Sequence, residues 1–271
     1  MKFLIVGVGA VGSVFLAFLS KAGYKAVGLL KEGKTLNRIK VEGIWGEFEE
    51  EVKVAYETSE LDFLPDVIIL SVKSYDTEEA LKKVSSLVER GSYVLLAQNG
   101  YGNYEKATKL LGEEKVILSR VIFGAKLVEW GRVRVTVCAD DVLLGSPKEA
   151  IDEGFLRSLA DTLKSAGIPS RYEKDVYKYL WEKIIYNSAL NPLGALFEVS
   201  YGELAKNNHT KALMDRIIEE AFEVIKAHNI QTFYSSPEEY KKRFYEELLP
   251  PTATHFPSML EDIKRGKTEI D

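Results

Sequence analysis

Three polar side chains, Lys183, Asn187 and Asn191, recur at every fourth position of a stretch that is otherwise largely apolar. Each residue of an α-helix turns the chain by about 100°, so a step of four residues rotates a side chain by only about 40°. The three side chains therefore lie along one stripe of the helix that we predict here. An ammonium group and two amides on an apolar helix must find hydrogen-bond partners. A substrate cleft would provide them, and a solvated edge of the helix is the alternative.

A second group of residues forms the pattern G-x-G-x-x-G directly after an apolar run at residues 3–6. A strand that enters a glycine turn and then a helix is typical of dinucleotide-binding sites. The first glycine allows the tight turn, the second lets the backbone approach a pyrophosphate, and the third lets the helix pack on the strand. The N–H groups and the positive dipole end of the helix then face the phosphates. A tight turn without a ligand is the alternative. The residues that we expect to contact the cofactor are Gly7, Val8, Gly9, Ala10, Val11 and Gly12.

The residue at the end of the second predicted strand, residues 26–30, normally faces the adenosine ribose of the cofactor. An acidic residue there binds the 2′-hydroxyl of NAD, and a basic residue accepts the 2′-phosphate of NADP. This position reads Lys31-Glu32 and is followed by Lys34 and Arg38. Lys31 would favour NADP and Glu32 would favour NAD, and both could instead be solvated charges of the turn.

Two further polar residues follow apolar runs that are typical of strands buried on both faces of a parallel sheet. Lys73 follows the run at residues 66–72, and Asn99 follows the run at residues 93–97. Ligands bind at the carboxyl ends of such strands. Lys73 could contact a cofactor phosphate, and Asn99 could bridge a nicotinamide ribose and a substrate oxygen because its amide both donates and accepts hydrogen bonds. A surface lysine and a turn asparagine before glycine are the alternatives.

These residues belong to two predicted domains. Residues 1–171 alternate apolar strands with amphipathic helices, which predicts a Rossmann-type dinucleotide-binding domain of the α/β class. Near its end, residues 131–137 and 141–145 are expected to pair as a hairpin. Residues 172–271 lack strand signals, and we predict an all-helical substrate and catalytic domain. Pro192 is expected to disrupt the first helix of that domain just after Asn191.

The composition excludes several classes of protein. Of 271 residues 46% are apolar, enough for a sizeable core, and 36 basic against 41 acidic residues give a formal net charge of −5. This balance argues against nucleic acid or a membrane surface as a partner. With one cysteine, Cys138, and 3 histidines that lack metal-ligand spacing, we expect no internal disulfide and no protein-bound metal. The chain has no signal-peptide pattern and no membrane-spanning apolar run, so we expect it in the cytoplasm.

Five motifs together make the chain resemble the ketopantoate reductase (2-dehydropantoate 2-reductase) family over nearly its whole length. They are GVGAVG at residues 7–12, SVKSYD at 71–76, QNG at 98–100, WEKIIYNSALNPL at 181–193 and PSMLEDIKRGKTEID at 257–271. The resemblance implies an N-terminal Rossmann domain, a helical C-terminal domain and an active site in the cleft between them. It also implies reduction of 2-dehydropantoate, a small 2-oxo acid, to (R)-pantoate in the biosynthesis of pantothenate and coenzyme A. The implied cofactor is NADP, and Glu32 keeps NAD as the alternative.

The resemblance also assigns roles to individual residues. Lys183 would be the general acid, and Glu269 would hydrogen-bond the reacting or a nearby hydroxyl and contact the cofactor. Lys31 and Lys73 would face the ribose and the phosphates of the cofactor. Asn99 would hold both the nicotinamide ribose and the substrate. The remaining substrate contacts would be Asn187, Asn191 and Ser258.

Three features depart from the family pattern. Glu32 stands beside the position where the family often has an arginine for the 2′-phosphate, and the spacing from Ser258 to Glu269 is one residue shorter than usual. Relatives also continue beyond the equivalent of residue 271, so we expect a truncated or absent C-terminal tail. Without the resemblance, Ser258 would be interpreted as a helix-start hydroxyl and Glu269 as a surface acid.

Two other functions remain open. A reductase of another 2-oxo acid would use the same kinds of residue, and a non-catalytic NAD(P)-binding regulator would need the glycine turn alone. The aligned lysine and asparagines count against the regulator. A helical second domain often provides a dimer surface, so a homodimer is a further expectation.

Overall fold

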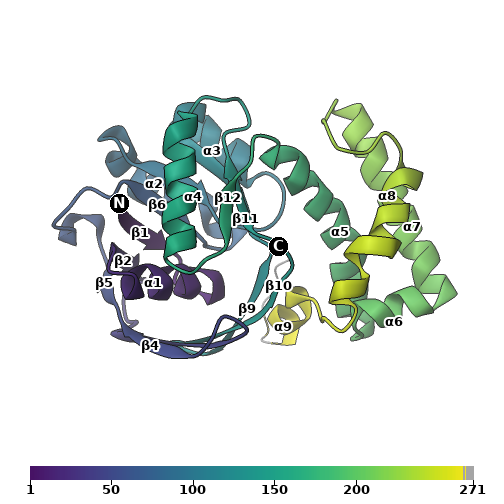
Figure 1. The fold of residues 1–271 in the computed structure, drawn as a ribbon, viewed down its shortest axis with the longest axis horizontal. Coiled ribbons are helices and arrows are strands. Elements are labelled where there is room, and N and C mark those ends of the chain that lie inside the picture. The colour runs from purple at the N-terminus through teal and green to yellow at the C-terminus, as the bar shows by residue number, and fades with distance from the viewer. Residues whose placement is uncertain (265, 267–271) are drawn as a thin grey trace. The chain divides into compact units, whose positions relative to one another are not determined.

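The computed structural model describes residues 1–264 and 266, and the chain divides into two units, Met1–Val176 and Tyr177–Asp271. The first unit combines sheets with helices, and the described part of the second unit is helical (Figure 1). The predicted fold class, a Rossmann-type α/β domain followed by a helical domain, is confirmed.

An eight-stranded sheet runs through the first unit in the order β12-β11-β8-β7-β6-β1-β2-β5. Neighbouring strands are parallel except for β8 and β11, which are antiparallel. The central strands are apolar and buried, as expected where helices cover both faces of a parallel sheet. The strands are β1 (Lys2–Val6), β2 (Lys25–Leu29), β5 (Lys53–Ala55), β6 (Val67–Leu70), β7 (Tyr93–Leu96), β8 (Val116–Arg120), β11 (Val142–Gly145) and β12 (Ser170–Tyr172).

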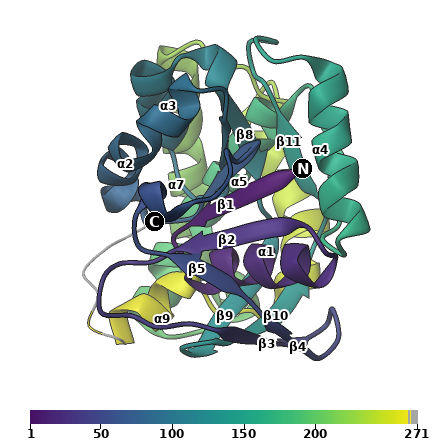
Figure 2. The ribbon, with the colours of Figure 1, turned by 90° about the vertical axis from the view of Figure 1, so that its left-hand side faces the viewer.

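Helix α1 (Ala10–Lys21) lies between this sheet and a four-stranded sheet with the order β4-β3-β10-β9 (Figure 2). All of residues 12–19 are buried, because a helix covered from two sides needs small or apolar side chains around most of its surface. The Phe18 ring packs edge-on against Trp45 and Phe48, with ring centroids 5.7 and 5.0 Å away. The strands of the small sheet are β3 (Arg38–Gly43), β4 (Phe48–Glu51), β9 (Phe123–Glu129) and β10 (Arg132–Cys138).

The other helices of the first unit are amphipathic, and each buries one apolar face. In α2 (Thr77–Glu89) the buried positions include Ala80, Leu81 and Val84, at helical spacing. The other two long helices are α3 (Asn103–Leu111) and α4 (Glu153–Ser165), and the short 3₁₀ turns are η1 (Thr58–Glu60), η2 (Ser74–Asp76) and η3 (Glu113–Lys115).

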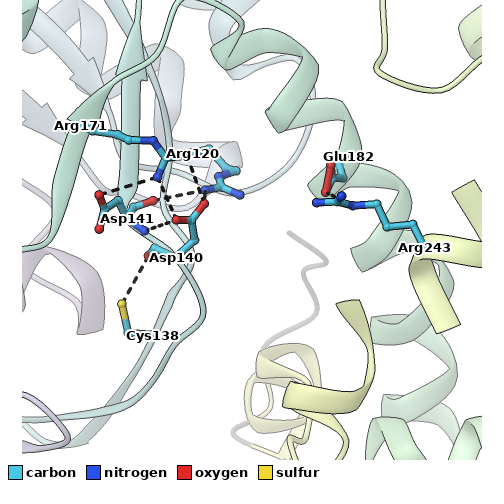
Figure 3. A network of polar contacts seen from close by, with 7 residues as sticks. All are labelled: Arg120, Cys138, Asp140, Asp141, Arg171, Glu182 and Arg243. Atoms are coloured by element: carbon cyan, nitrogen blue, oxygen red, sulfur yellow. Dashed lines mark hydrogen bonds and ion pairs between the residues drawn. The ribbon is translucent and has the colours of Figure 1, made fainter. Parts of the chain in front are cut away.

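The expected pairing of residues 131–137 with 141–145 is wrong, because β10 belongs to the small sheet and β11 to the large one. Two arginines hold the chain where it crosses between the sheets (Figure 3). Arg120 Nη2 donates to Asp140 Oδ2 at 2.6 Å, and Arg171 Nη1 donates to Asp140 Oδ1 at 2.8 Å. Arg120 ends β8 and Arg171 lies in β12, so β11 continues between these two strands instead of folding back on β10.

The second unit is built around α5 (Val176–Phe197), which contains the predicted polar stripe. The helix continues through Pro192, so the expected disruption after Asn191 is wrong. A proline leaves the carbonyl four residues earlier without its helical hydrogen bond. Both Pro192 and that residue, Ser188, are exposed, so water can satisfy the carbonyl.

The rest of the second unit packs on α5 through aromatic and aliphatic side chains, with Tyr240 and Phe244 fully buried. Helix α8 (Pro237–Arg243) is capped by Ser236, whose hydroxyl accepts a hydrogen bond from the Glu239 backbone N–H. None of the described helices combines the length and the apolar character needed to span a membrane. The remaining elements are α6 (Tyr201–Lys206), α7 (Asn208–Ala227), α8 (Pro237–Arg243), η4 (Phe244–Leu248), η5 (Pro250–Thr252) and α9 (Ser258–Lys264).

The crossing at Asp140 makes the stability of the first unit dependent on pH. Burial raises the pKa of Asp140, but hydrogen bonds from Arg171 and Arg120 outweigh burial and hold the pKa at about 2. An unfolded aspartate has a pKa of about 3.9, so the stabilisation is complete above about pH 4 and is lost as the pH falls toward 2. The side chain is 38% exposed, and solvent screening reduces the full conversion of about 2 kcal/mol to about 1 kcal/mol.

We predict that Asp140→Asn lowers the free energy of unfolding by about 1 kcal/mol at pH 7. Urea denaturation should show this difference shrinking as the pH falls below 4, because the wild-type carboxylate is then protonated. The matched control is Asp161→Asn, at an exposed position of α4. A loss of stability that stayed constant from pH 7 to pH 2 would contradict the electrostatic explanation.

Candidate active site

The turn between β1 and α1 packs directly on the chain that follows β6. Gly7 has a φ of +93°, and a Cβ there would lie 2.6 Å from the Val72 backbone nitrogen. A Cβ on Gly12 would lie 2.2 Å from the Gly7 carbonyl oxygen. The Ser71 hydroxyl donates to the same carbonyl oxygen at 2.8 Å. Both glycines are therefore required by packing as well as by the turn.

Gly9 shares this turn, but the structure leaves open space where a side chain would stand. No described atom outside the turn lies within 4 Å of a Cβ built on Gly9. Gly9 precedes α1, and the first N–H groups of a helix have no partner within the helix. The backbone at residues 9–12 can therefore approach an anion, and a pyrophosphate carries the charge that a helix N-terminus favours. The turn fits a dinucleotide.

The chain after β6 is tied to the end of β7 by Gln98. Its Nε2 donates to the Val72 carbonyl oxygen at 2.9 Å and to Thr77 Oγ1 at 2.8 Å. Gln98 is 9% exposed and Thr77 is fully buried, so water does not compete for these bonds. Because β6 and β7 are parallel neighbours, the loops that follow them leave the same edge of the sheet.

Asn103 completes this connection between the two loops. Its Nδ2 donates to the Asn99 carbonyl oxygen at 2.8 Å and to Ser74 Oγ at 3.2 Å. Ser74 directly follows Lys73. The structure thus brings Lys73 and Asn99, which follow different strands, to one edge of the sheet. Their contact with a cofactor stays a prediction.

Lys31 reaches the same edge from the end of β2. Its Nζ lies 3.3 Å from Oδ2 of Asp76, in η2 just after Lys73. The next two basic residues, Lys34 and Arg38, contact other side chains. Lys34 Nζ lies 4.6 Å from the centre of the Trp130 ring, and Arg38 donates to Glu51 at 3.1 Å within the small sheet.

Glu32, the residue that would favour NAD, is exposed. Lys31 is also well exposed, with 75% of its side chain accessible. Its ion pair with Asp76 is therefore weak in water. Such a pair leaves the lysine able to turn toward a phosphate. The position of Lys31 does not decide between NADP and NAD.

Neither a reactive thiol nor a metal centre is indicated in the described part of the chain. Cys138 is partly buried, and burial raises the pKa of its thiol. Its Sγ donates to the Asp140 carbonyl oxygen at 3.3 Å. Within residues 1–264 and 266, no three His, Cys, Asp or Glu side chains cluster in a way that could hold a metal ion.

In the second unit, Lys183, Asn187 and Asn191 lie on successive turns of α5, about 6 Å apart along the helix axis. Lys183 and Asn187 are partly buried, and Asn191 is only 9% exposed. None of the three stands on a fully solvated face. The stripe therefore presents polar groups that are only partly open to water.

Tyr201 fixes the orientation of Asn191. The Tyr201 hydroxyl donates to Asn191 Oδ1 at 2.7 Å. The amide nitrogen of Asn191 must then point away from Tyr201. Burial raises the pKa of Tyr201, and the neighbouring Tyr186 raises it further, so the hydroxyl stays a donor at neutral pH. The Tyr186 hydroxyl is itself hydrogen-bonded to Thr252. The Asn191 amide is therefore an oriented donor.

The remaining predicted residues lie near or beyond the end of the described chain. Ser258 is exposed and begins α9, consistent with its interpretation as a helix-start hydroxyl. The residue before it, Pro257, packs against α5, since a Cβ on Gly194 would lie 3.1 Å from Pro257 Cδ. This places Ser258 near the turn of α5 that follows Asn191. Glu269 lies outside the described residues.

Sequence reasoning missed the positioning roles of three residues, Gln98 and Asn103 in the first unit and Tyr201 in the second. Gln98 and Asn103 flank Asn99 closely in sequence, so two more amides around a predicted ligand residue were a usable signal. Tyr201 lies 10 residues after Asn191 and in another helix. No spacing rule connects it with Asn191.

The chain matches two family models. Residues 3–149 match the model described as ketopantoate reductase PanE/ApbA, and residues 175–271 match its C-terminal counterpart. A 2-dehydropantoate 2-reductase of Aquifex aeolicus is 62% identical over 271 residues, which are 100% of this chain and 87% of that relative.

Solved structures share the fold. A crystal structure of 2-dehydropantoate 2-reductase from Geobacter metallireducens matches with a TM-score of 0.85 and 26% identity, covering 99% of this chain and 89% of that one. The ternary structure of D-mandelate dehydrogenase with NADH and anilino(oxo)acetate matches with a TM-score of 0.82 and 24% identity, covering 98% of this chain and 87% of that one. Because this second likeness is below 25% identity, it speaks for the fold alone. The two family models and the Aquifex relative show that the chain belongs to the ketopantoate reductase PanE/ApbA family.

Proposed function

We propose that this protein catalyses the NAD(P)H-dependent reduction of 2-dehydropantoate to (R)-pantoate. The observation that carries the proposal is the 62% identity, over the whole chain, to a relative named 2-dehydropantoate 2-reductase. On this proposal Met1–Val176 is the dinucleotide-binding unit, and the helical unit holds the 2-oxo acid. A cytoplasmic location and a homodimer accompany the proposal as further predictions.

The proposed cofactor is NADPH, with NADH as the second candidate. The reduced nicotinamide supplies the hydride when it is bound. Residues 7–12 would hold the pyrophosphate, Lys31 the 2′-phosphate, and Lys73 and Asn99 the remaining phosphate and ribose groups. The open space at Gly9 and the shared edge of Lys73 and Asn99 support these assignments.

The helical unit has the groups that the chemistry needs. Reduction of a ketone places negative charge on its oxygen, and a positioned acid must supply a proton there. Lys183 would donate this proton from its ammonium group. Asn187 and Asn191 would bind the hydroxyl and carboxylate ends of the substrate, together with Ser258 and Glu269. Asn191 suits this role because Tyr201 already holds its amide oxygen, which leaves the amide nitrogen to donate to a negatively charged group of the substrate.

A reductase of another 2-oxo acid is the second candidate. The D-mandelate dehydrogenase that shares this fold shows that the fold does not itself select 2-dehydropantoate. A binding-only regulator is less well supported, since it would have no need of a half-buried Lys183 on the same stripe as two asparagines.

The first prediction of this proposal concerns turnover and its dependence on Lys183. We expect NADPH or NADH oxidation with 2-dehydropantoate, and a loss of kcat of at least about 100-fold in Lys183→Ala, the usual range for a lost general acid. The matched control is Lys206→Ala, an exposed lysine paired with Glu203. Turnover of phenylglyoxylate but not 2-dehydropantoate would favour the second candidate. Dinucleotide binding without turnover of either acid would favour the regulator, and normal kcat in Lys183→Ala would refute the general-acid role.

A second prediction separates cofactor binding from folding. Gly9→Ala should keep the wild-type Tm, because its Cβ meets open space, and should weaken dinucleotide binding at least about 10-fold by blocking the pyrophosphate. Gly12→Ala should lower the free energy of unfolding by about 1–3 kcal/mol, because its Cβ would overlap the Gly7 carbonyl. Calorimetry of folding and of NADPH binding would measure both effects. Unchanged NADPH binding in a folded Gly9→Ala variant would contradict the proposed cofactor position.

A third prediction concerns the choice of cofactor. Lys31→Ala should lower kcat/KM for NADPH about 10-fold and leave that for NADH nearly unchanged, because only NADPH carries the 2′-phosphate. Lys34→Ala, whose ammonium group lies over Trp130, is the matched control. A selective loss with NADH in Glu32→Ala, and none with NADPH in Lys31→Ala, would instead identify Glu32 as the selecting residue.

A further inference from the structure

Glu182 is a buried carboxylate directly before Lys183 in α5. It is 8% exposed, and its helix neighbours Trp181 and Ile185 are 4% and 0% exposed. A charged side chain in such surroundings is costly unless it is paired and hydrogen-bonded. An apolar side chain could fill the same space without that cost. What the carboxylate provides, and an apolar side chain would not, is a set of directed hydrogen bonds that can fix its position.

Three side chains from the segment 234–243 hold Glu182. The Tyr234 hydroxyl donates to Glu182 Oε2 at 2.8 Å, and the Tyr240 hydroxyl donates to the Glu182 backbone oxygen at 3.1 Å. Arg243 Nε lies 3.7 Å from Glu182 Oε1 (Figure 3). These partners contact both the side chain and the backbone of the one residue, so they restrain rotation of the helix as well as its distance.

The partners are themselves fixed and keep their donor form. Tyr240 is fully buried, and its ring packs edge-on against that of Tyr234 at 5.0 Å between centroids. Burial raises the pKa of Tyr234, and a hydrogen bond to Glu182 raises it further, so this hydroxyl is protonated at neutral pH. Arg243 also lies 3.3 Å from Glu247 in a largely exposed and therefore weak pair, so the two tyrosines provide most of the restraint on Glu182.

One turn further along α5, Tyr186 continues the same row. It is four residues after Glu182, and its hydroxyl is hydrogen-bonded to Thr252. The row of Glu182 and Tyr186 is displaced by about 100° from the row of Lys183 and Asn187. Polar contacts to the row of Glu182 and Tyr186 therefore fix the direction in which the row of Lys183 and Asn187 points.

We infer that Glu182 is a positioning residue, which fixes the rotation of α5 and so directs Lys183. This inference rests on the proposed function. The end of a side chain lies about 5–6 Å from the axis of its helix, so a rotation of about 10° moves it by about 1 Å. A misplacement of about 1 Å can cost about 100-fold in rate. The bonds to Glu182 oppose such a rotation.

Three variants test the inference through kcat. Glu182→Leu and Tyr234→Phe should lower kcat about 10- to 100-fold while KM for NADPH stays unchanged, because both residues belong to the helical unit and not to the unit that carries the dinucleotide turn. Glu182→Gln keeps an oxygen that can accept from Tyr234, and it should stay within about threefold of wild type. Glu220→Leu, at an exposed position of α7, is the control for lost acidic charge. The rates are normalised to folded, cofactor-binding sites, so a loss of folded protein alone would not lower them.

The same substitution in a Lys183→Ala background shows whether the effect passes through Lys183. Glu182→Leu should lower the residual kcat of Lys183→Ala by a smaller factor than it lowers the wild-type kcat, since no ammonium group is left to misplace and only the asparagines of the same helix are still displaced. An equal loss in both backgrounds would overturn the inference. So would an unchanged kcat in Glu182→Leu, or a loss in Glu182→Gln as large as that in Glu182→Leu.

A readout without turnover separates this inference from the proposed function. Glu182→Leu should change the rate at which an amine reagent modifies Lys183, mapped by mass spectrometry, by at least about threefold relative to Lys206. Absence of wild-type turnover with every 2-oxo acid tested would refute the proposed function, and the labelling would still test the position of Lys183. An unchanged labelling ratio would refute the positioning role.

Discussion

The close approach of α1 to the end of β1 is the contact on which the first unit depends. Since no Cβ fits between Gly12 and the Gly7 carbonyl, the helix begins at the edge of the large sheet and passes directly beneath it. The small sheet can then close over its other side, and residues 12–19 are buried from both directions. The same contact sets where the first N–H groups of α1 point. The same close contact therefore determines both how the core packs around α1 and where the N–H groups of the glycine turn point.

The helical unit meets a different difficulty, because α5 carries polar groups through apolar surroundings. Tyrosine hydroxyls satisfy two of these groups: Tyr234 donates a hydrogen bond to Glu182, and Tyr201 donates one to Asn191. A tyrosine fills the core with its ring and satisfies an acceptor with its hydroxyl. Each polar group on α5 that receives such a bond keeps a defined orientation. The helix can thus remain buried and still present an ordered polar stripe.

Features encoded over a few residues were predictable from the sequence, including the apolar parallel strands, the glycine turn and the four-residue spacing on α5. Contacts between distant segments were not. The partners of Glu182 and Asn191 lie 52 and 10 residues further along the chain, and neither is marked by a local pattern. The hairpin pattern likewise predicted the strand near residues 131–137 but not its sheet, because a local pattern can identify a strand without identifying the strand beside it. The roles assigned to Lys183 and Glu269 came from the family resemblance.

The small sheet is made from two separate excursions of the chain, β3–β4 between β2 and β5, and β9–β10 between β8 and β11. They join through parallel pairing of β3 with β10, where Glu42 stands opposite Arg134, 92 residues further along. Until these strands meet, each excursion has an unpaired edge. Closing so long a loop costs conformational entropy before any contact rewards it. The small sheet can therefore cover α1 only after two segments that are far apart in the sequence have paired. Contacts of this kind form slowly, so we expect this face of α1 to be buried late in folding.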